Sequence, residues 1–171
     1  MLTQVTLEAA AVVAGEWDYA VNFGGGSRTA SAPNSEMFLA KYGGADGHYV
    51  WDTLITGTAT IYANSVAADS QNNILLTGQF CRTYSFGTQA LTADNSNAFI
   101  YDGFVAKYSG GGAPVWASNI ASLNAADGNS VAVDASGNSF VAGSLQGTAT
   151  FGSQLLTSIG SVDTFLMKLN P

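Results

Sequence analysis

The sequence predicts an all-β protein built from a repeated four-stranded sheet, and three observations support this prediction. A unit of about 65 residues recurs along the chain. Short apolar runs alternate with turns rich in Gly, Asn, Ser and Asp, as many short strands joined by tight turns require. Only 10% of the residues are charged while 47% are hydrophobic and 11% are aromatic, which indicates a folded domain with a core.

The most regular part of the unit predicts its first two strands. Residues 65–78 return as residues 130–143, with Ser-Val-Ala at the start, Asp at the fifth position and Gly at the end. Between the two halves, residues 135–138 supply the Gly and Asn that a tight hairpin with positive φ requires. We therefore expect strands at about 129–134 and 139–145, paired antiparallel.

A second motif predicts the other two strands. An acid, then Phe, then Lys occurs at residues 36–42, 102–108 and 163–169. The second unit carries an insertion at 95–101, which must be a loop. A Gly-rich turn and a tryptophan follow the first two copies, and the predicted fourth strand there covers residues 114–120.

The apolar patterns favour β-propeller blades over a β-sandwich. Runs such as 74–76 and 140–142 are apolar at successive positions, so both faces of these strands should be buried. Stacked blades cover both faces of a sheet, whereas a sandwich covers one. We predict one repeat region, divided into a partial blade at 1–51, a complete repeat at 52–116 and a truncated repeat at 117–171.

The start of the chain aligns with the middle of a unit. Residues 12–15 match 140–143, so we expect the chain to begin inside or just before a second strand. The 171 residues hold about 2.6 units, too few to close a ring of four to eight blades. Two explanations remain open: the chain is part of a longer propeller, or identical copies join head to tail.

The unit resembles the bacterial β-propeller repeat called SBBP and, more distantly, the NHL-type propeller. The likeness rests on the Val-Ala-Val-Asp, Gly-Asn and aromatic-Val-Ala-Gly core at 130–143, on residues 148–157, and on the motif at 163–168. Two departures are the degenerate first turn at 8–11 and the missing Gly at 71–72. The resemblance implies several blades in an exported or cell-surface bacterial protein, and it implies no particular reaction.

Charge and cysteine content exclude several classes of function. A net charge of −7 with five Lys and Arg residues disfavours nucleic acid and anionic membrane surfaces as partners. Cys81 is the single cysteine, which excludes an intrachain disulfide and multi-cysteine zinc sites, and we expect no cofactor. No apolar run approaches 18 residues, so no membrane insertion is expected. Glu8 interrupts the apolar stretch at 7–14, so an export signal would lie outside this chain.

The recurring charged residues are expected to be structural. The lysine of the second motif should lay its stem between blades and place its ammonium beside Asp69 or Asp134. The acid that begins the motif should accept hydrogen bonds from backbone donors, with cation binding as the alternative. Asp69 and Asp134 begin hairpin turns that hold too few carboxylates for a calcium loop. The motif residues are Lys41, Lys107, Lys168, Glu36, Asp102 and Asp163.

Four aromatic residues are the candidates for ligand binding. Trp51 and Trp116 recur in two units, so packing between blades competes with stacking on sugars. Trp17 has no repeat counterpart, and Tyr101 lies in the insertion, which makes both better candidates. His48 lies in a turn, without a nucleophile-elbow motif anywhere in the sequence. We therefore expect a non-enzymatic structural or protein-interaction module, with a carbohydrate-binding propeller as the alternative and a hydrolase as the weakest.

Overall fold

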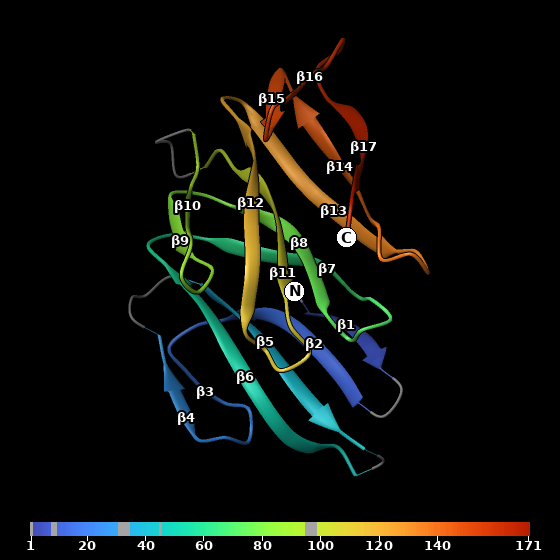
Figure 1. Ribbon diagram of the computed structural model, residues 1–171. Helices are drawn as coiled ribbons and strands as arrows, with labels where there is room; N and C mark the ends of the chain where they lie inside the picture. The colour runs from blue at the N-terminus through green and yellow to red at the C-terminus, as the bar shows by residue number, and fades with distance from the viewer. Residues whose placement is uncertain (1, 8–9, 31–34, 45, 95–98) are drawn as a thin grey trace.

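A computed structural model describes residues 2–7, 10–30, 35–44, 46–94 and 99–171, and it confirms the all-β prediction (Figure 1). Every regular element in these residues is a β-strand. No helix long and apolar enough to span a membrane occurs in this described part. Glu8, on the degenerate first turn, and the residues 95–98 of the insertion lie outside the described residues.

The first four strands of the first sheet, which form the first blade, are antiparallel neighbours in chain order. They are β1 (Leu2–Leu7), β2 (Ala10–Trp17), β5 (Glu36–Gly43) and β6 (His48–Gly57). The expectation that the chain begins inside or just before a second strand is therefore wrong. β1 was missed because its sequence, Leu-Thr-Gln-Val-Thr-Leu, lacks the Val-Ala-Val-Asp pattern, although it alternates and packs Val5 against the core.

The second sheet repeats this order, and the third has three of the four strands. The second holds β7 (Ile61–Ala68), β8 (Ile74–Phe80), β11 (Asp102–Tyr108) and β12 (Pro114–Ser122). The third holds β13 (Ala125–Val133), β14 (Ser139–Gln146) and β17 (Asp163–Leu169). All four predicted strands are present, with β13 beginning earlier than expected. Residues 51 and 116, at which the predicted divisions end, lie within β6 and β12.

Three short hairpins between the second and third strands were not predicted. They are β3 (Ala20–Asn22) with β4 (Ser27–Thr29), β9 (Thr83–Ser85) with β10 (Ala90–Thr92), and β15 (Thr148–Phe151) with β16 (Gln154–Thr157). The hairpin of each following blade extends the sheet before it, since β9 pairs with β6 and β15 pairs with β12. Backbone hydrogen bonds thus join successive blades.

The three sheets stack face to face in chain order, as Figure 1 shows from blue to red. The inner strand β7 contacts both β1 and β13. One apolar cluster lies between the first and second sheets and includes Leu39, Leu76 and Phe104. Another lies between the second and third and includes Leu75, Val105 and Phe165. The sheets are therefore blades, and the described residues form no closed ring.

The glycine that ends the second-strand motif is required by a bulge in the inner strand. The β7–β8 register shifts between Ala63 and Ser65, and the β13–β14 register shifts at the equivalent place. A Cβ on Gly78 would collide with the carbonyl oxygen of Tyr62, and one on Gly143 with that of Asp127. Only glycine leaves room for the backbone to approach so closely.

Candidate functional site

The three repeated lysines have three different partners. Lys107 Nζ lies 3.3 Å from Asp69 Oδ2, and both side chains are largely buried. Lys41 Nζ donates a 3.1 Å hydrogen bond to the carbonyl oxygen of Gly110, in the turn after β11 of the second blade. Lys168 Nζ lies 5.9 Å from the centre of the Phe140 ring. Lys41 therefore joins the first blade to the second, Lys107 fastens β11 to the β7–β8 turn within the second blade, and Lys168 lies on the last sheet.

Asp69 closes the turn between the first two strands of its blade. Its Oδ1 accepts hydrogen bonds from the backbone nitrogens of Gln71 at 2.9 Å and Asn73 at 2.8 Å. Burial alone would raise the pKa of Asp69, but hydrogen bonds from Asn73, Lys107 and Gln71 lower it below its usual value. Asn72 adopts φ 64°, so Asn takes the left-handed position of the missing glycine.

Asp134 closes the equivalent turn of the third blade in the same way. Its Oδ1 accepts hydrogen bonds at 2.9 Å from the backbone nitrogens of Ser136 and Asn138. The side chain of Asn138 donates to Oδ2 at 2.7 Å, and this bond is the main reason why the pKa of Asp134 lies below its usual value. All the donors are turn residues, so the carboxylate is engaged by its own loop.

The acids that begin the third strand differ in burial. Asp102 is fully buried and accepts 3.0 Å hydrogen bonds from the backbone nitrogens of Asp94 and Ser122. Burial raises its pKa to about 6. Asp163 accepts a 2.6 Å bond from the backbone nitrogen of Ile159, and Glu36 is buried. No group of three or more His, Cys, Asp or Glu side chains placed to hold a metal occurs in the described ranges.

The four aromatic candidates lie in separate places. Trp17 is only 6% exposed, packs with Phe38, and has an indole nitrogen without a hydrogen-bond partner. Trp51 packs between the first two blades and Trp116 between the next two. Tyr101 faces Tyr62, with ring centres 5.9 Å apart. The structure does not bring these aromatic side chains into one site.

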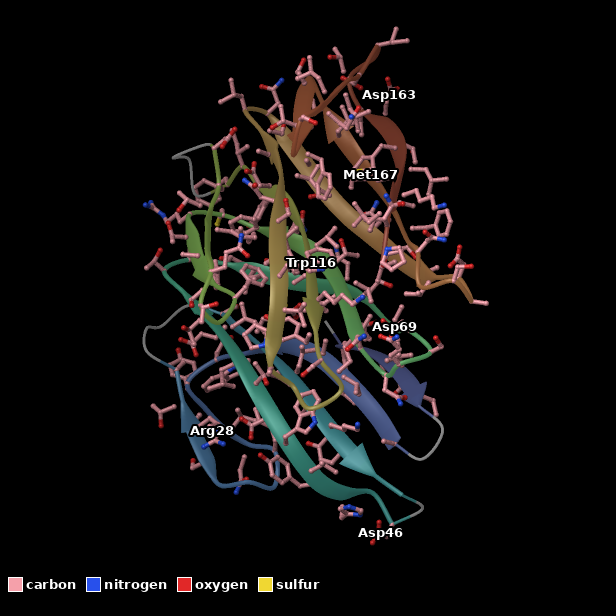
Figure 2. The ribbon with its side chains drawn as sticks, in the orientation of Figure 1. Arg28, Asp46, Asp69, Trp116, Asp163 and Met167 are labelled. Carbon is pink, nitrogen blue, oxygen red and sulfur yellow. The ribbon has the colours of Figure 1, made fainter. Side chains whose placement is uncertain are left out.

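His48 and Cys81 have simple local contacts. His48 Nδ1 lies 2.8 Å from Asp46 Oδ1 in an exposed turn, and this hydrogen bond lowers the pKa of Asp46 below its usual value. Cys81 is fully buried, and its thiol lies 3.6 Å from the carbonyl oxygen of Thr60. Figure 2 shows Asp46 at the tip of the first blade, far from the stacked interior.

An ion pair that the sequence did not reveal fastens the first hairpin. Arg28 on β4 donates to Asp52 on β6, from Nε to Oδ2 at 2.9 Å and from Nη2 to Oδ1 at 3.1 Å. Tyr49 donates a 2.7 Å bond to the same carboxylate. Burial opposes ionisation of Asp52, but the bonds from Arg28 and Tyr49 lower its pKa. Residues 24 apart in sequence gave no signal for this contact.

The third blade exposes a face that the first two bury. Leu39 and Val105 occupy the same place in β5 and β11, and both are fully buried against the next blade. Leu166, their counterpart on β17, is 72% exposed. We call Phe140, Leu166 and Lys168 the open face; Figure 1 shows their strands, β14 and β17, at one end of the stack.

A groove of about 500 Å³ runs beside the open face. It lies between β17 and the β15–β16 turn, and its lining includes Gly152, Gln154, Leu166, Met167 and Lys168. Figure 2 shows Met167 on β17 and Trp116 on β12 of the neighbouring blade. Sequence reasoning missed this groove, although Gly152 recurs 65 residues after Gly87 and Gln154 recurs 65 residues after Gln89.

The sequence is distantly similar to a curated protein. The chain is 29% identical over 131 residues to an uncharacterized WD repeat-containing protein, L264, of Acanthamoeba polyphaga mimivirus. The match covers 71% of this chain and 9% of that much longer protein. No protein-family model matches the sequence. The similarity to a WD repeat-containing protein and the stacked antiparallel sheets both point to a propeller-type repeat family.

Proposed function

We propose that the chain is a non-enzymatic protein-interaction module that assembles through the open face of its third blade. The observation that carries this proposal is the contrast between Leu39 and Val105, which are fully buried, and Leu166, which is 72% exposed. The same residue position is an interface in two blades and is uncovered in the third. The distant WD repeat-containing relative supports a role in protein interaction.

The energetics favour covering this face with another protein surface. Burying a leucine side chain contributes about 1.5–3 kcal/mol of favourable free energy. An apolar face that is exposed to water therefore marks a binding surface. Lys168 does not oppose this, because the equivalent Lys41 is accommodated at a blade interface by the carbonyl oxygen of Gly110. The partner is a further blade, either from a longer propeller or from a second copy packed head to tail.

The setting that we propose is an exported or cell-surface bacterial protein of the SBBP type. The support is the residue-level resemblance at 130–143 and 163–168. An acidic chain with few cationic residues also suits a protein whose partners are neither nucleic acids nor anionic membranes.

Native mass measurement tests assembly through the open face. We expect the wild type to form a discrete oligomer and Leu166→Glu to be monomeric, because the glutamate would place a charge in the interface. Val50→Glu is the matched control, since Val50 is an exposed apolar strand residue of the first blade. A monomeric wild type, or an oligomer that survives Leu166→Glu, contradicts assembly of copies through this face.

A further inference from the structure

The groove of the third blade is already filled in the other two. The fourth strand of the first blade, β6, pairs with β5 so that Trp51 lies opposite Lys41. In the second blade, β12 pairs with β11 so that Trp116 lies opposite Lys107. In the third blade the described residues place no strand beside β17, whose paired neighbour is β14. The two filled blades therefore show what the third can accept.

A hairpin glycine marks the place where the fourth strand enters each groove. A Cβ on Gly24 would collide with the side chain of Tyr49, and a Cβ on Gly87 would collide with the ring of Pro114. Both colliding residues lie at the start of a fourth strand. Gly152 is the third member of this series, and a Cβ there would meet nothing within 4 Å. The space over Gly152 can therefore accept a ring-bearing residue, as the equivalent glycines of the first two blades do.

A hydrogen-bond acceptor indicates which of the two fourth strands, β6 or β12, fits the groove of the third blade. In the second blade, Gln89 Oε1 accepts a 3.1 Å bond from the backbone nitrogen of Ala117 on β12. Gln154 stands at the same position of the third hairpin and lines the groove. The first blade instead uses the ion pair of Arg28 with Asp52. The third hairpin has the chemistry of the second blade.

We propose that this groove binds an extended segment of the β12 type, supplied from outside these 171 residues, as an antiparallel fourth strand on β17. The segment carries Pro-Val-Trp, a small residue at the next position, and Ile four residues after the Trp, as residues 114–120 do. Its proline rests on Gly152, the nitrogen of its small residue donates to Gln154, and its Trp lies opposite Lys168. This inference rests on the proposed function and names the partner of the third blade.

The groove discriminates against a strand of the β6 type. In that strand an aspartate, Asp52, follows the Trp and needs Arg28 as its partner. The third hairpin carries the apolar Leu156 in its corresponding strand, so the aspartate would lose its ion pair. An unpaired carboxylate beside apolar groups is costly. The occupant is therefore neutral at the residue after its Trp.

Peptide binding to the intact chain tests the proposal. The probe is a fluorescein-labelled peptide with the sequence of residues 113–122, and fluorescence anisotropy measures its affinity. We expect saturable 1:1 binding, at least tenfold weaker binding of the same peptide with Trp replaced by Ala, and at least tenfold weaker binding of a peptide with the sequence of residues 48–57. A reversed-sequence peptide controls for composition.

Two protein variants locate the binding site. Gly152→Asn should weaken binding at least tenfold, because its side chain would occupy the seat of the proline, and Asn tolerates the φ of 56° found there. Gly137→Asn is the matched control and should bind within twofold of wild type, since Asn72 already adopts the equivalent φ. Gln154→Ala should weaken binding about fivefold through the loss of one hydrogen bond.

The outcomes separate this inference from the proposed function. Absence of peptide binding, or binding that Gly152→Asn leaves unchanged, overturns the groove as a strand site even if the wild type is oligomeric. An oligomer that Gly152→Asn dissociates, and with which the peptide does not compete, assigns the groove to a second copy and overturns the proposed occupant. A monomeric chain that binds the peptide at Gly152 supports the inference and contradicts assembly of copies through the open face.

Discussion

At the scale of single residues, Asp69 and Asp134 occupy the same turn position but should contribute differently to the free energy of unfolding. Both accept two backbone hydrogen bonds in their turns. Asp69 also neutralises the largely buried Lys107. Asp69→Ala should therefore lower the free energy of unfolding by about 3 kcal/mol, since a buried ammonium loses its partner. Asp134→Ala should cost about 1 kcal/mol, and urea denaturation of both variants measures the difference. Equal losses would contradict a special role for the ion pair.

Asp102 makes the stability of the protein depend on pH. Burial raises its pKa in the folded chain to about 6, from an ordinary value of 3.8. The folded state therefore holds the proton more tightly than the unfolded state does, so stability contributed by this group is present below pH 4 and is lost as pH rises to about 6. The expected loss is about 2–3 kcal/mol.

The variant Asp102→Asn isolates this contribution, because its amide does not titrate. Its free energy of unfolding relative to wild type should rise between pH 4 and pH 6 and then stay constant. Asp46→Asn is the control, since Asp46 is exposed and its pKa is lowered instead. A difference between wild type and Asp102→Asn that does not change with pH would show that Asp102 titrates normally.

At the scale of strands, the bulge opposite Gly143 fixes how the first two strands of the third blade meet. A Cβ at this position would collide with the carbonyl oxygen of Asp127 and with the ring of Phe165. Gly143→Ala should lower the free energy of unfolding by about 2–3 kcal/mol, because overpacking must displace backbone. Gly111→Ala is the control, since its Cβ would make only an ordinary contact at 3.8 Å. Thermal denaturation should show a lower melting temperature for Gly143→Ala and little change for Gly111→Ala.

The sequence predicted the strands that carry the long repeated motifs and missed β1 and the short hairpins. The Val-Ala-Val-Asp motif recurs because the second and third blades share the same bulge and turn, and the Phe-Lys motif recurs in all three blades. These motifs, the match of residues 12–15 and the Trp after the Gly-rich turn indicated β2, β5, β7, β8, β11, β12, β13, β14 and β17. β1 has a different sequence for the same place, and the three hairpins have strands of only three or four residues. Two of these hairpins also pair, through β9 and β15, with the fourth strand of the preceding blade, which no local pattern reports.

The candidate site was less predictable than the fold. Trp17, Trp51, Tyr101 and Trp116 were selected by residue type, and the structure distributes them among different contacts. The open face and the groove depend on which copy of a repeated position is covered. Leu166 has the same motif context as Leu39, so the motif itself carries no sign that one is buried and the other exposed. The incomplete number of repeats predicts an uncovered blade face without identifying its residues.

At the scale of the whole molecule, the third blade should gain stability when its fourth strand is supplied. We propose a fused chain in which residues 109–122 follow residue 169, which restores the register between Lys107 and Trp116 at Lys168. The added Trp and Ile side chains would bury apolar surface worth about 3 kcal/mol. The melting temperature should then rise by about 6–12 °C for a chain of this size.

Gly152→Asn within the fused chain is the decisive control for this gain. The same substitution in the unfused chain has no strand to disturb, because nothing lies within 4 Å of a Cβ at this position. Differential scanning calorimetry should therefore show that Gly152→Asn removes most of the added stability from the fused chain and changes the unfused chain little. Since the appended segment would then be displaced from β17, the labelled peptide should also fail to bind. If the fused chain has the same melting temperature as the unfused chain, β17 does not accept a fourth strand. The same conclusion follows if Gly152→Asn leaves the melting temperature of the fused chain unchanged.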